Sequence, residues 1–236
     1  MRLDKFIQTK FNLKSRTYAE NLILTKCVKV NGTVVEKPSF NVDENAVVEI
    51  VKDEGYASQG AYKLEEAFKV FTLDVNGKYC IDIGCSNGGF SDCMLRHGAG
   101  KILAIDVAEC ALDEELLKSG KIEFLRANAR ELPIDNETFD FACSDVSFIS
   151  LKYILAEIYR ILKIGGEAVV LVKPQFELTK SALDKNGIVK NEKLRKSALD
   201  GVKEFAVAVG FKIVGVETSP VRYQNKNVEY LLYIKK

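Results

Sequence analysis

A glycine-rich segment at the end of an apolar run is the feature that most constrains the fold of this chain. The run KYCIDIG (78–84) has the length and composition of a buried strand, and DIGCSNGGF (82–90) overlaps its end. Glycines let the backbone turn sharply and approach a ligand closely. In a doubly wound α/β sheet, such a turn joins a strand to a helix and forms part of a ligand site. We therefore expect a Rossmann-like domain with its site near Gly84.

From residue 60 onward the chain alternates between strand-like and helix-like segments. We expect strands at 78–84, 101–107, 122–128, 139–146 and 167–174, and helices at 63–71, 90–97, 111–119, 149–163 and 192–210. This alternation predicts an α/β fold, with helices covering the faces of a parallel sheet. The last apolar runs, 211–217 and 228–235, are predicted to form an antiparallel hairpin at one edge of that sheet.

The first 52 residues have the pattern of a small α+β domain. Two short helical segments come first, and Ser15 is placed to cap the second one. In VKVNGTVV (28–35), Asn31-Gly32 lies between alternating apolar residues, which predicts a tight hairpin turn. The domains expected are therefore 1–52 for this small domain, 53–59 for a linker and 60–236 for the Rossmann-like domain.

Basic residues are concentrated at the amino terminus, although the whole chain has a net charge of only +1. Residues 1–30 contain seven Lys or Arg side chains and two acids. A basic face on a nearly neutral protein suggests contact with a polyanion, and the alternative is an ordinary solvated helix surface. The charge pattern alone leaves both open.

Hydropathy and cysteine spacing argue against several classes of protein. No apolar run reaches the roughly 18 residues of a membrane helix, and MRLDKFIQTK lacks the apolar core of a signal peptide. The six cysteines form no C-x-x-C pair, and the single His97 gives them no histidine-rich partner set. We therefore expect a cytoplasmic protein without a membrane segment and without a metal site. The oligomeric state stays open.

Two acids indicate which cofactor the loop would bind. Asp106 ends the second strand 22 residues after Gly84, about the offset of an acid that binds ribose hydroxyls. Asp82 would repel the pyrophosphate of NAD, but it suits the ammonium and sulfonium groups of S-adenosylmethionine, which we therefore favour. Asn128 would lie near the adenine or cap a turn. The candidate cofactor-binding residues are Asp82, Gly84, Cys85, Ser86, Gly88, Phe90, Asp106, Asn128 and Asp145.

Two charged residues end the fourth and fifth predicted strands. Asp145 follows FDFACS and Lys173 follows EAVVLV, so both should lie at the edge of the sheet that holds the cofactor loop. A carboxylate beside a lysine can orient its ammonium for proton chemistry on a hydroxyl group. The alternative is a structural ion pair, because a charge at the end of an apolar strand is costly without a partner.

The segments MRLDKF, KSRTYAENLI, VKVNG and KPSF resemble an S4 RNA-binding domain over residues 1 to about 52. In that module the second helix and the hairpin present basic and polar groups to structured RNA. The resemblance implies RNA contacts by Arg2, Lys5, Lys14, Ser15, Arg16, Lys26, Lys29, Asn31 and Lys37.

The segments SQGAYKLEEAF, DIGCSNGGFSDCML, DVSFISL, LVKPQFE, GIV and NVEYL are similar to the hemolysin A (TlyA) family over essentially the whole chain. Its members join an S4 domain to an FtsJ-like methyltransferase. The resemblance implies 2'-O-methylation of ribose, at cytidine, in ribosomal RNA or a ribosomal subunit, with Lys173 and Asp145 activating the hydroxyl. The implied catalytic tetrad is Lys63, Asp145, Lys173 and Glu229. The alternatives are a membrane-active hemolysin and an RNA-binding protein with weak or lost turnover.

Overall fold

The chain divides into two compact units, Met1–Gln59 and Gly60–Lys236, and each is described here by itself. In the computed structural model of the protein, the described residues are 1–13, 16–24, 27–43, 45–50, 56–58, 60–109, 112, 114–220 and 227–236. Most of the predicted linker therefore lies outside the described residues.

The first unit is a small α+β domain, as the sequence predicts. Helices α1 (Leu3–Lys10) and α2 (Arg16–Leu24) pack on a three-stranded antiparallel sheet in the order β2-β1-β3. The strands are β1 (Val28–Val30), β2 (Thr33–Val34) and β3 (Val48–Ile50). Asn31 and Gly32 have φ angles of 49° and 79°, so the predicted hairpin turn uses the left-handed backbone that Asn-Gly favours. Apolar side chains from both helices and from the sheet form its core.

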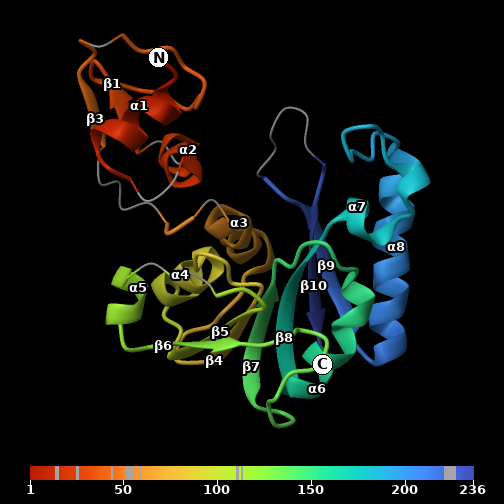
Figure 1. Ribbon diagram of the computed structural model, residues 1–236. Helices are drawn as coiled ribbons and strands as arrows, with labels where there is room; N and C mark the ends of the chain where they lie inside the picture. The colour runs from red at the N-terminus through yellow and green to blue at the C-terminus, as the bar shows by residue number, and fades with distance from the viewer. Residues whose placement is uncertain are drawn as a thin grey trace. The chain divides into compact units, whose positions relative to one another are not determined.

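The second unit contains a seven-stranded sheet in the order β6-β5-β4-β7-β8-β10-β9 (Figure 1). The five parallel strands are β4 (Tyr79–Ile83), β5 (Lys101–Asp106), β6 (Ile122–Arg126), β7 (Phe139–Ser144) and β8 (Leu162–Val172). The antiparallel pair at the edge is β9 (Lys212–Thr218) and β10 (Tyr230–Lys235). The predicted Rossmann-like sheet with an antiparallel edge hairpin is therefore confirmed.

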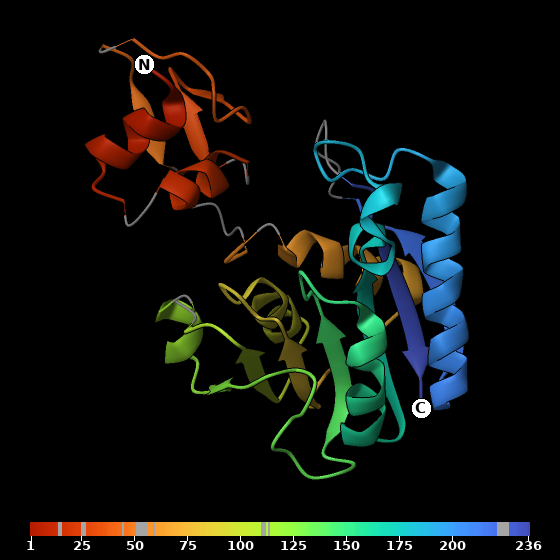
Figure 2. The same ribbon diagram turned by 45° about the vertical axis from the view of Figure 1, so that its right-hand side comes forward.

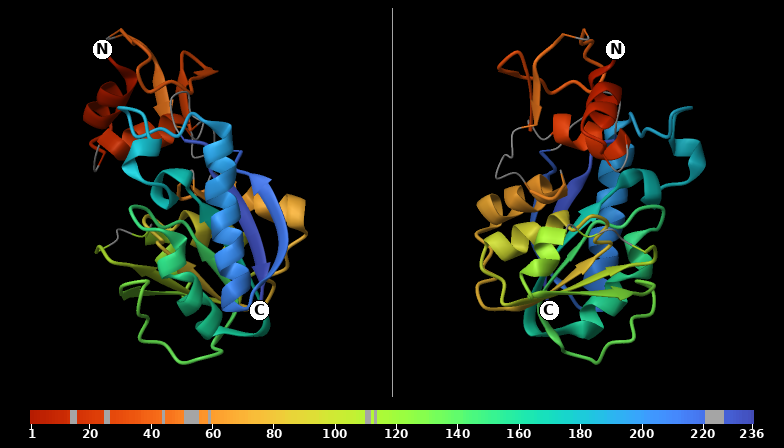
Figure 3. Two further views of the ribbon diagram at one scale, coloured as in Figure 1. Left: turned by 90° about the vertical axis from the view of Figure 1, so that its right-hand side faces the viewer. Right: turned by 60° about the vertical axis from the view of Figure 1, so that its left-hand side comes forward.

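Helices cover both faces of this sheet (Figure 3). Helices α6 (Leu155–Ile161) and α8 (Glu192–Val209) lie on one face, where their apolar residues join a core with the sheet. Helices α3 (Gly60–Phe71) and α4 (Gly89–Arg96) pack together on the other face. Gly210, with φ of 121°, ends α8 as predicted.

The structure differs from the predicted elements between residues 149 and 174. One long helix was expected, but the segment forms a 3₁₀ turn η1 (Leu151–Tyr153), then the short α6, and strand β8 begins at Leu162. Leu162 has an extended backbone (φ −75°, ψ 139°) and pairs with Phe139. Ile161 and Leu162 are both fully buried, and a buried helix and a buried strand need the same apolar residues. The spacing of apolar residues therefore could not show where α6 ends and β8 begins.

Shorter elements complete the unit. They are α5 (Glu114–Lys118), α7 (Pro174–Glu177) and η2 (Lys180–Ala182). Helix α5 is shorter than the predicted helix 111–119, part of which lies outside the described residues. Among the helices of the described chain, none is long and apolar enough to cross a membrane.

Candidate active site

The carboxyl ends of the parallel strands meet at one edge of the sheet, and the predicted site residues follow directly after them. The arrow of β7 points to this edge, whereas the arrow of β10 points away from it (Figure 2). A cavity of about 330 Å³ opens here between the ends of β4, β5, β6 and β7. Five of the predicted cofactor residues line it: Gly84, Ser86, Asp106, Asn128 and Asp145.

The backbone at Gly84 leaves little room for a side chain. Its φ is +84°, a region that L-residues rarely adopt. A Cβ atom there would lie 3.2 Å from Val146 Cγ1 and 3.3 Å from the backbone of Asp145. Glycine therefore allows the end of β4 to approach the end of β7 closely and keeps the space at the cavity wall open for a ligand.

Asp106 lines the cavity, and its carboxylate binds two backbone N–H groups. Its carboxylate accepts hydrogen bonds from the backbone N–H of Ser86 (3.1 Å) and of Ala108 (3.0 Å). It therefore fixes the loop after β4, and its contact with ribose hydroxyls stays a prediction. Asn128 also lines the cavity, and its Oδ1 accepts a hydrogen bond from the Arg130 N–H (3.1 Å). The turn role of Asn128 is thus observed, and its contact with adenine stays a prediction.

Asp82 lies elsewhere than the sequence suggested. Its side chain is fully buried, does not line the cavity, and accepts hydrogen bonds from the backbone N–H (2.9 Å) and the hydroxyl (2.7 Å) of Ser91. Burial raises the pKa of Asp82 to about 7, against the opposing effect of the Ser91 hydrogen bonds. Asp82 therefore joins β4 to the start of α4. Cys85, Gly88 and Phe90 also contribute nothing to the cavity lining.

The four residues of the predicted tetrad form one continuous ion-pair network. Lys173 Nζ lies 2.6 Å from Asp145 Oδ1, and Lys63 Nζ lies 3.2 Å from Asp145 Oδ2. Lys63 Nζ also lies 2.8 Å from Glu229 Oε2, and Lys173 donates a hydrogen bond to Ser147 Oγ (2.8 Å). All four side chains of the tetrad are less than one-fifth exposed.

Sheet register explains how Glu229 reaches a lysine 166 residues away in sequence. Tyr230 at the start of β10 pairs with Val172 at the end of β8. Because these strands are antiparallel, Glu229 and Lys173 come to the same edge of the sheet. Lys63 comes from the first turn of α3, next to that edge.

The charges of the network stabilise one another. Burial alone would lower the pKa of Lys63, but the carboxylates of Asp145 and Glu229 outweigh it, and the pKa of Lys63 is raised. Burial would raise the pKa of Asp145, but Lys63 and Lys173 outweigh it, and the pKa of Asp145 is lowered. Lys63 and Asp145 are therefore both charged at neutral pH, and the Asp145 carboxylate pairs with two lysines.

Two residues that the sequence reasoning missed support this edge. Phe148 is 90% exposed with φ of +66°, lines the cavity, and has its ring 5.3 Å from that of Phe176. Glu177 accepts hydrogen bonds from the Ser150 hydroxyl (2.5 Å) and the Leu151 N–H (2.9 Å). The segment KPQFE thus anchors DVSFISL, and the joint presence of these motifs was the signal for both residues.

The predicted RNA-binding residues of the first unit differ in their surroundings. Arg2 and Arg16 both bind the buried carboxylate of Asp4, at 2.7 and 2.8 Å, so they help to hold this unit together. Asn31, in the hairpin turn, exchanges hydrogen bonds with Val47, the residue before β3. Lys5 and Lys37 are exposed and Lys29 is partly buried. Lys14, Ser15 and Lys26 lie outside the described residues.

The fold and the matching sequence profiles define the class of protein. The fold is shared with a solved S-adenosylmethionine-dependent methyltransferase from Mesorhizobium loti, which has a TM-score of 0.55 at 19% identity and covers 72% of this chain and 96% of its own. The sequence profile of the FtsJ-like methyltransferases matches residues 56–236, and that of the S4 domain matches residues 1–48. The chain is therefore an S-adenosylmethionine-dependent methyltransferase with an amino-terminal S4 domain.

Three relatives identify the family more closely. Hemolysin A of Brachyspira hyodysenteriae is 35% identical over 99% of both chains. The 16S/23S rRNA (cytidine-2'-O)-methyltransferase TlyA of Mycobacterium tuberculosis is 33% identical over 99% of this chain and 89% of its own. A solved structure from Streptococcus thermophilus, provisionally described as a hemolysin, has a TM-score of 0.76 at 33% identity and covers 100% of this chain and 88% of its own. The chain belongs to the hemolysin A (TlyA) family of FtsJ-like methyltransferases, as its motifs predicted.

Proposed function

We propose that this protein methylates the ribose 2'-hydroxyl of a cytidine in ribosomal RNA. The observation that carries the proposal is the network of Lys63, Asp145, Lys173 and Glu229, of which Asp145 lines the cofactor cavity. A relative that is 33% identical over nearly the whole chain is described as an enzyme with this activity. The substrate would place the enzyme in the cytoplasm, as the sequence predicts.

The residues fit the cofactor and the reaction. S-adenosylmethionine, when bound, supplies a methyl group on a positively charged sulfur. Asp106 would hold its ribose, and the bare backbone at Gly84 would lie against it. Lys173, kept in place by Asp145 and Ser147, would donate a hydrogen bond to the 2'-oxygen and stabilise the negative charge that develops there. The new C–O bond would form as the S–C bond of the donor breaks, with S-adenosylhomocysteine as the leaving group, and the hydroxyl proton would pass to water. Lys63 and Glu229 complete the network and position the ribose.

The exposed ring of Phe148 offers a place where the target base can bind. An aromatic ring that is 90% exposed at the cavity rim offers a flat surface on which a nucleobase can stack. Its left-handed backbone and its contact with the Phe176 ring hold it in that position. A flipped cytidine resting on Phe148 would bring its ribose toward Lys173.

Labelled methyl transfer onto ribosomal RNA that lacks the modification tests the proposal. A 2'-O-methyl group blocks alkaline cleavage of the adjacent phosphodiester, so the label should appear in alkali-resistant dinucleotides. Label in mononucleotides would indicate methylation of a base instead. No label with RNA, under conditions in which the cofactor binds, would overturn the proposal.

A further inference from the structure

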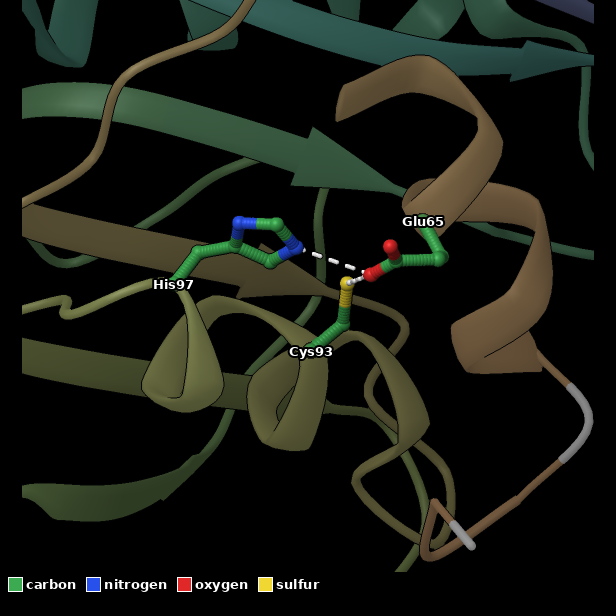
Figure 4. A group of neighbouring side chains, drawn as sticks. All are labelled: Glu65, Cys93 and His97. Atoms are coloured by element: carbon green, nitrogen blue, oxygen red, sulfur yellow. Dashed lines mark hydrogen bonds and ion pairs between the residues drawn. The ribbon is translucent and has the colours of Figure 1, made fainter. Parts of the chain in front are cut away.

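Three side chains of metal-ligand type form a cluster between α3 and α4. None of the three belongs to the cofactor cavity or to the tetrad. Glu65 comes from α3, Cys93 from α4, and His97 from the carboxyl end of α4, and the three side chains point toward one another (Figure 4). Their ligand atoms all lie within 4.8 Å of one another. From the sequence we expected no metal site, because the cysteines form no C-x-x-C pair and His97 is the single histidine. Glu65 lies 28 residues before Cys93, so the spacing of these residues did not indicate the cluster.

Local geometry explains how the cluster forms. Cys93 and His97 are four residues apart, so they lie on the same face of the helix. That face packs against α3, which carries Glu65. The imidazole of His97 stacks on the Phe68 ring, with centroids 3.8 Å apart and an interplanar angle of 3°. The stacking fixes the plane of the imidazole, and its Nε2 faces Glu65.

The distances are close to those of a tetrahedral ion. His97 Nε2 lies 2.8 Å and Cys93 Sγ lies 3.7 Å from the same oxygen, Glu65 Oε2. With zinc bonds of about 2.0 Å to N and O and about 2.3 Å to S, tetrahedral ligand atoms lie roughly 3.3–3.5 Å apart. The two distances to Glu65 Oε2 therefore differ from tetrahedral spacing by about half an ångström or less. The distance between Cys93 Sγ and the imidazole nitrogen is at most 4.8 Å, so the two side chains would move closer together around an ion.

We propose that Glu65, Cys93 and His97 bind a divalent cation of the zinc type, with water as the fourth ligand. Thiolate, imidazole and carboxylate form a donor set that zinc prefers. The ion replaces the two hydrogen bonds that now meet at Glu65 Oε2, and the Cys93 thiol loses its proton on binding. Cys93 is fully buried, whereas the His97 side chain is 33% exposed, so water reaches the ion from the side of His97.

The ion would join two helices that carry or adjoin parts of the methyltransferase site. Helix α3 carries Lys63, two residues before Glu65, and α4 begins directly after the cofactor loop. An ion held by both helices would limit the movement of one against the other. Lys69 Nζ lies 4.0 Å from Glu65 Oε1, so this lysine already forms an ion pair with the same carboxylate. The site needs no RNA and no bound cofactor, so its test is independent of the proposed function.

Cobalt(II) binding to the metal-depleted full-length protein tests the site, because cobalt occupies zinc sites and reports its ligands in its absorption spectrum. We expect one ion per chain, a sulfur-to-cobalt charge-transfer band, and displacement of cobalt by zinc. Cys93→Ser should abolish the band, and Glu65→Gln should weaken binding at least tenfold. Cys27→Ser, which removes a buried thiol in the other unit, is the matched control and should change neither result.

Thermal unfolding gives a second readout. Zinc should raise the Tm of the wild type and of Cys27→Ser, but not that of Cys93→Ser. The proposal is overturned if the wild type binds no cobalt or shows no charge-transfer band, a result that needs no variant to fold. It is equally overturned if Cys93→Ser and Glu65→Gln bind the ion as tightly as the wild type.

Discussion

At the scale of single residues, Lys173 carries the largest share of the proposed chemistry. Its side chain is 8% exposed, pairs with Asp145 and donates to Ser147. Such a buried lysine could be an ion-pair partner or a catalytic group, and the sequence left both open. The geometry shows the ion pair, and the position next to the cofactor cavity supports the catalytic role.

Replacing Lys173 with alanine should slow methyl transfer by a factor of about 10²–10⁴, the usual range for a group that assists proton removal. Lys63 still neutralises Asp145 in this variant, so we expect the fold to persist and the cofactor Kd to change less than twofold. Single-turnover transfer and cofactor titration measure the two quantities. Lys180→Ala, at an exposed position, is the control, and unimpaired transfer in Lys173→Ala would contradict the role of Lys173.

The raised pKa of the buried Asp82 should make the free energy of unfolding depend on pH. Its pKa is about 7 in the folded protein and 3.8 as an isolated group, so the folded state holds an extra proton between these values. Stability should therefore fall as pH rises from about 4 to about 7, by about 4 kcal/mol in total. Denaturant unfolding of the wild type and Asp82→Asn checks this, because the variant should lose the slope. Parallel pH profiles for the two proteins would show that Asp82 is ionised in both states.

At the scale of elements, the turn between β4 and α4 sets the shape of the cofactor cavity. Gly84→Ala would bring its Cβ within 3.3 Å of the Asp145 backbone, whereas Gly120, with a similar positive φ of +67°, has nothing within 4 Å of its Cβ position. We expect both alanine variants to lose stability by about 1 kcal/mol or more from the backbone alone. Only Gly84→Ala should also weaken cofactor binding, by tenfold or more. Equal cofactor affinity in the two variants would contradict the importance of this close approach.

The same elements show what a sequence can and cannot predict. The apolar runs predicted the seven strands of this sheet, most clearly β4 and β7, in which nearly every residue is buried on both faces of the sheet. The spacing of apolar residues could not place the start of β8, since Ile161 and Leu162 suit a buried helix and a buried strand equally. It also could not show that Asp82 faces Ser91, because the direction of one side chain depends on packing. Sequence alone also does not show that Glu229 reaches Lys63, because this contact depends on the register of β10 against β8.

At the scale of the whole molecule, the two units divide the proposed work between RNA binding and methyl transfer. Arg16 was a candidate RNA contact, but it holds the buried Asp4, so its charge reversal would destabilise the first unit itself. Lys5 and Lys37 are exposed and are better probes of RNA binding. The structural positions of these side chains therefore change which variants can test the S4 domain.

Reversing the charges of Lys5 and Lys37 together should weaken binding to ribosomal RNA about tenfold or more and should reduce its dependence on salt. The cofactor Kd should stay unchanged, because the other unit contains the cavity. Filter binding at several salt concentrations measures the effect. The double charge reversal of Lys193 and Lys196 on α8, in the other unit, is the control. Equal losses in both double variants would show a general effect of net charge.

The most direct test of the central claim is a map of 2'-O-methylation on ribosomal RNA from cells that lack this gene. We predict that a cytidine methylation is absent in those cells, returns with the wild-type gene, and fails to return with the Lys173→Ala variant produced at the same level. A methylation map that is the same with and without the gene would contradict the account.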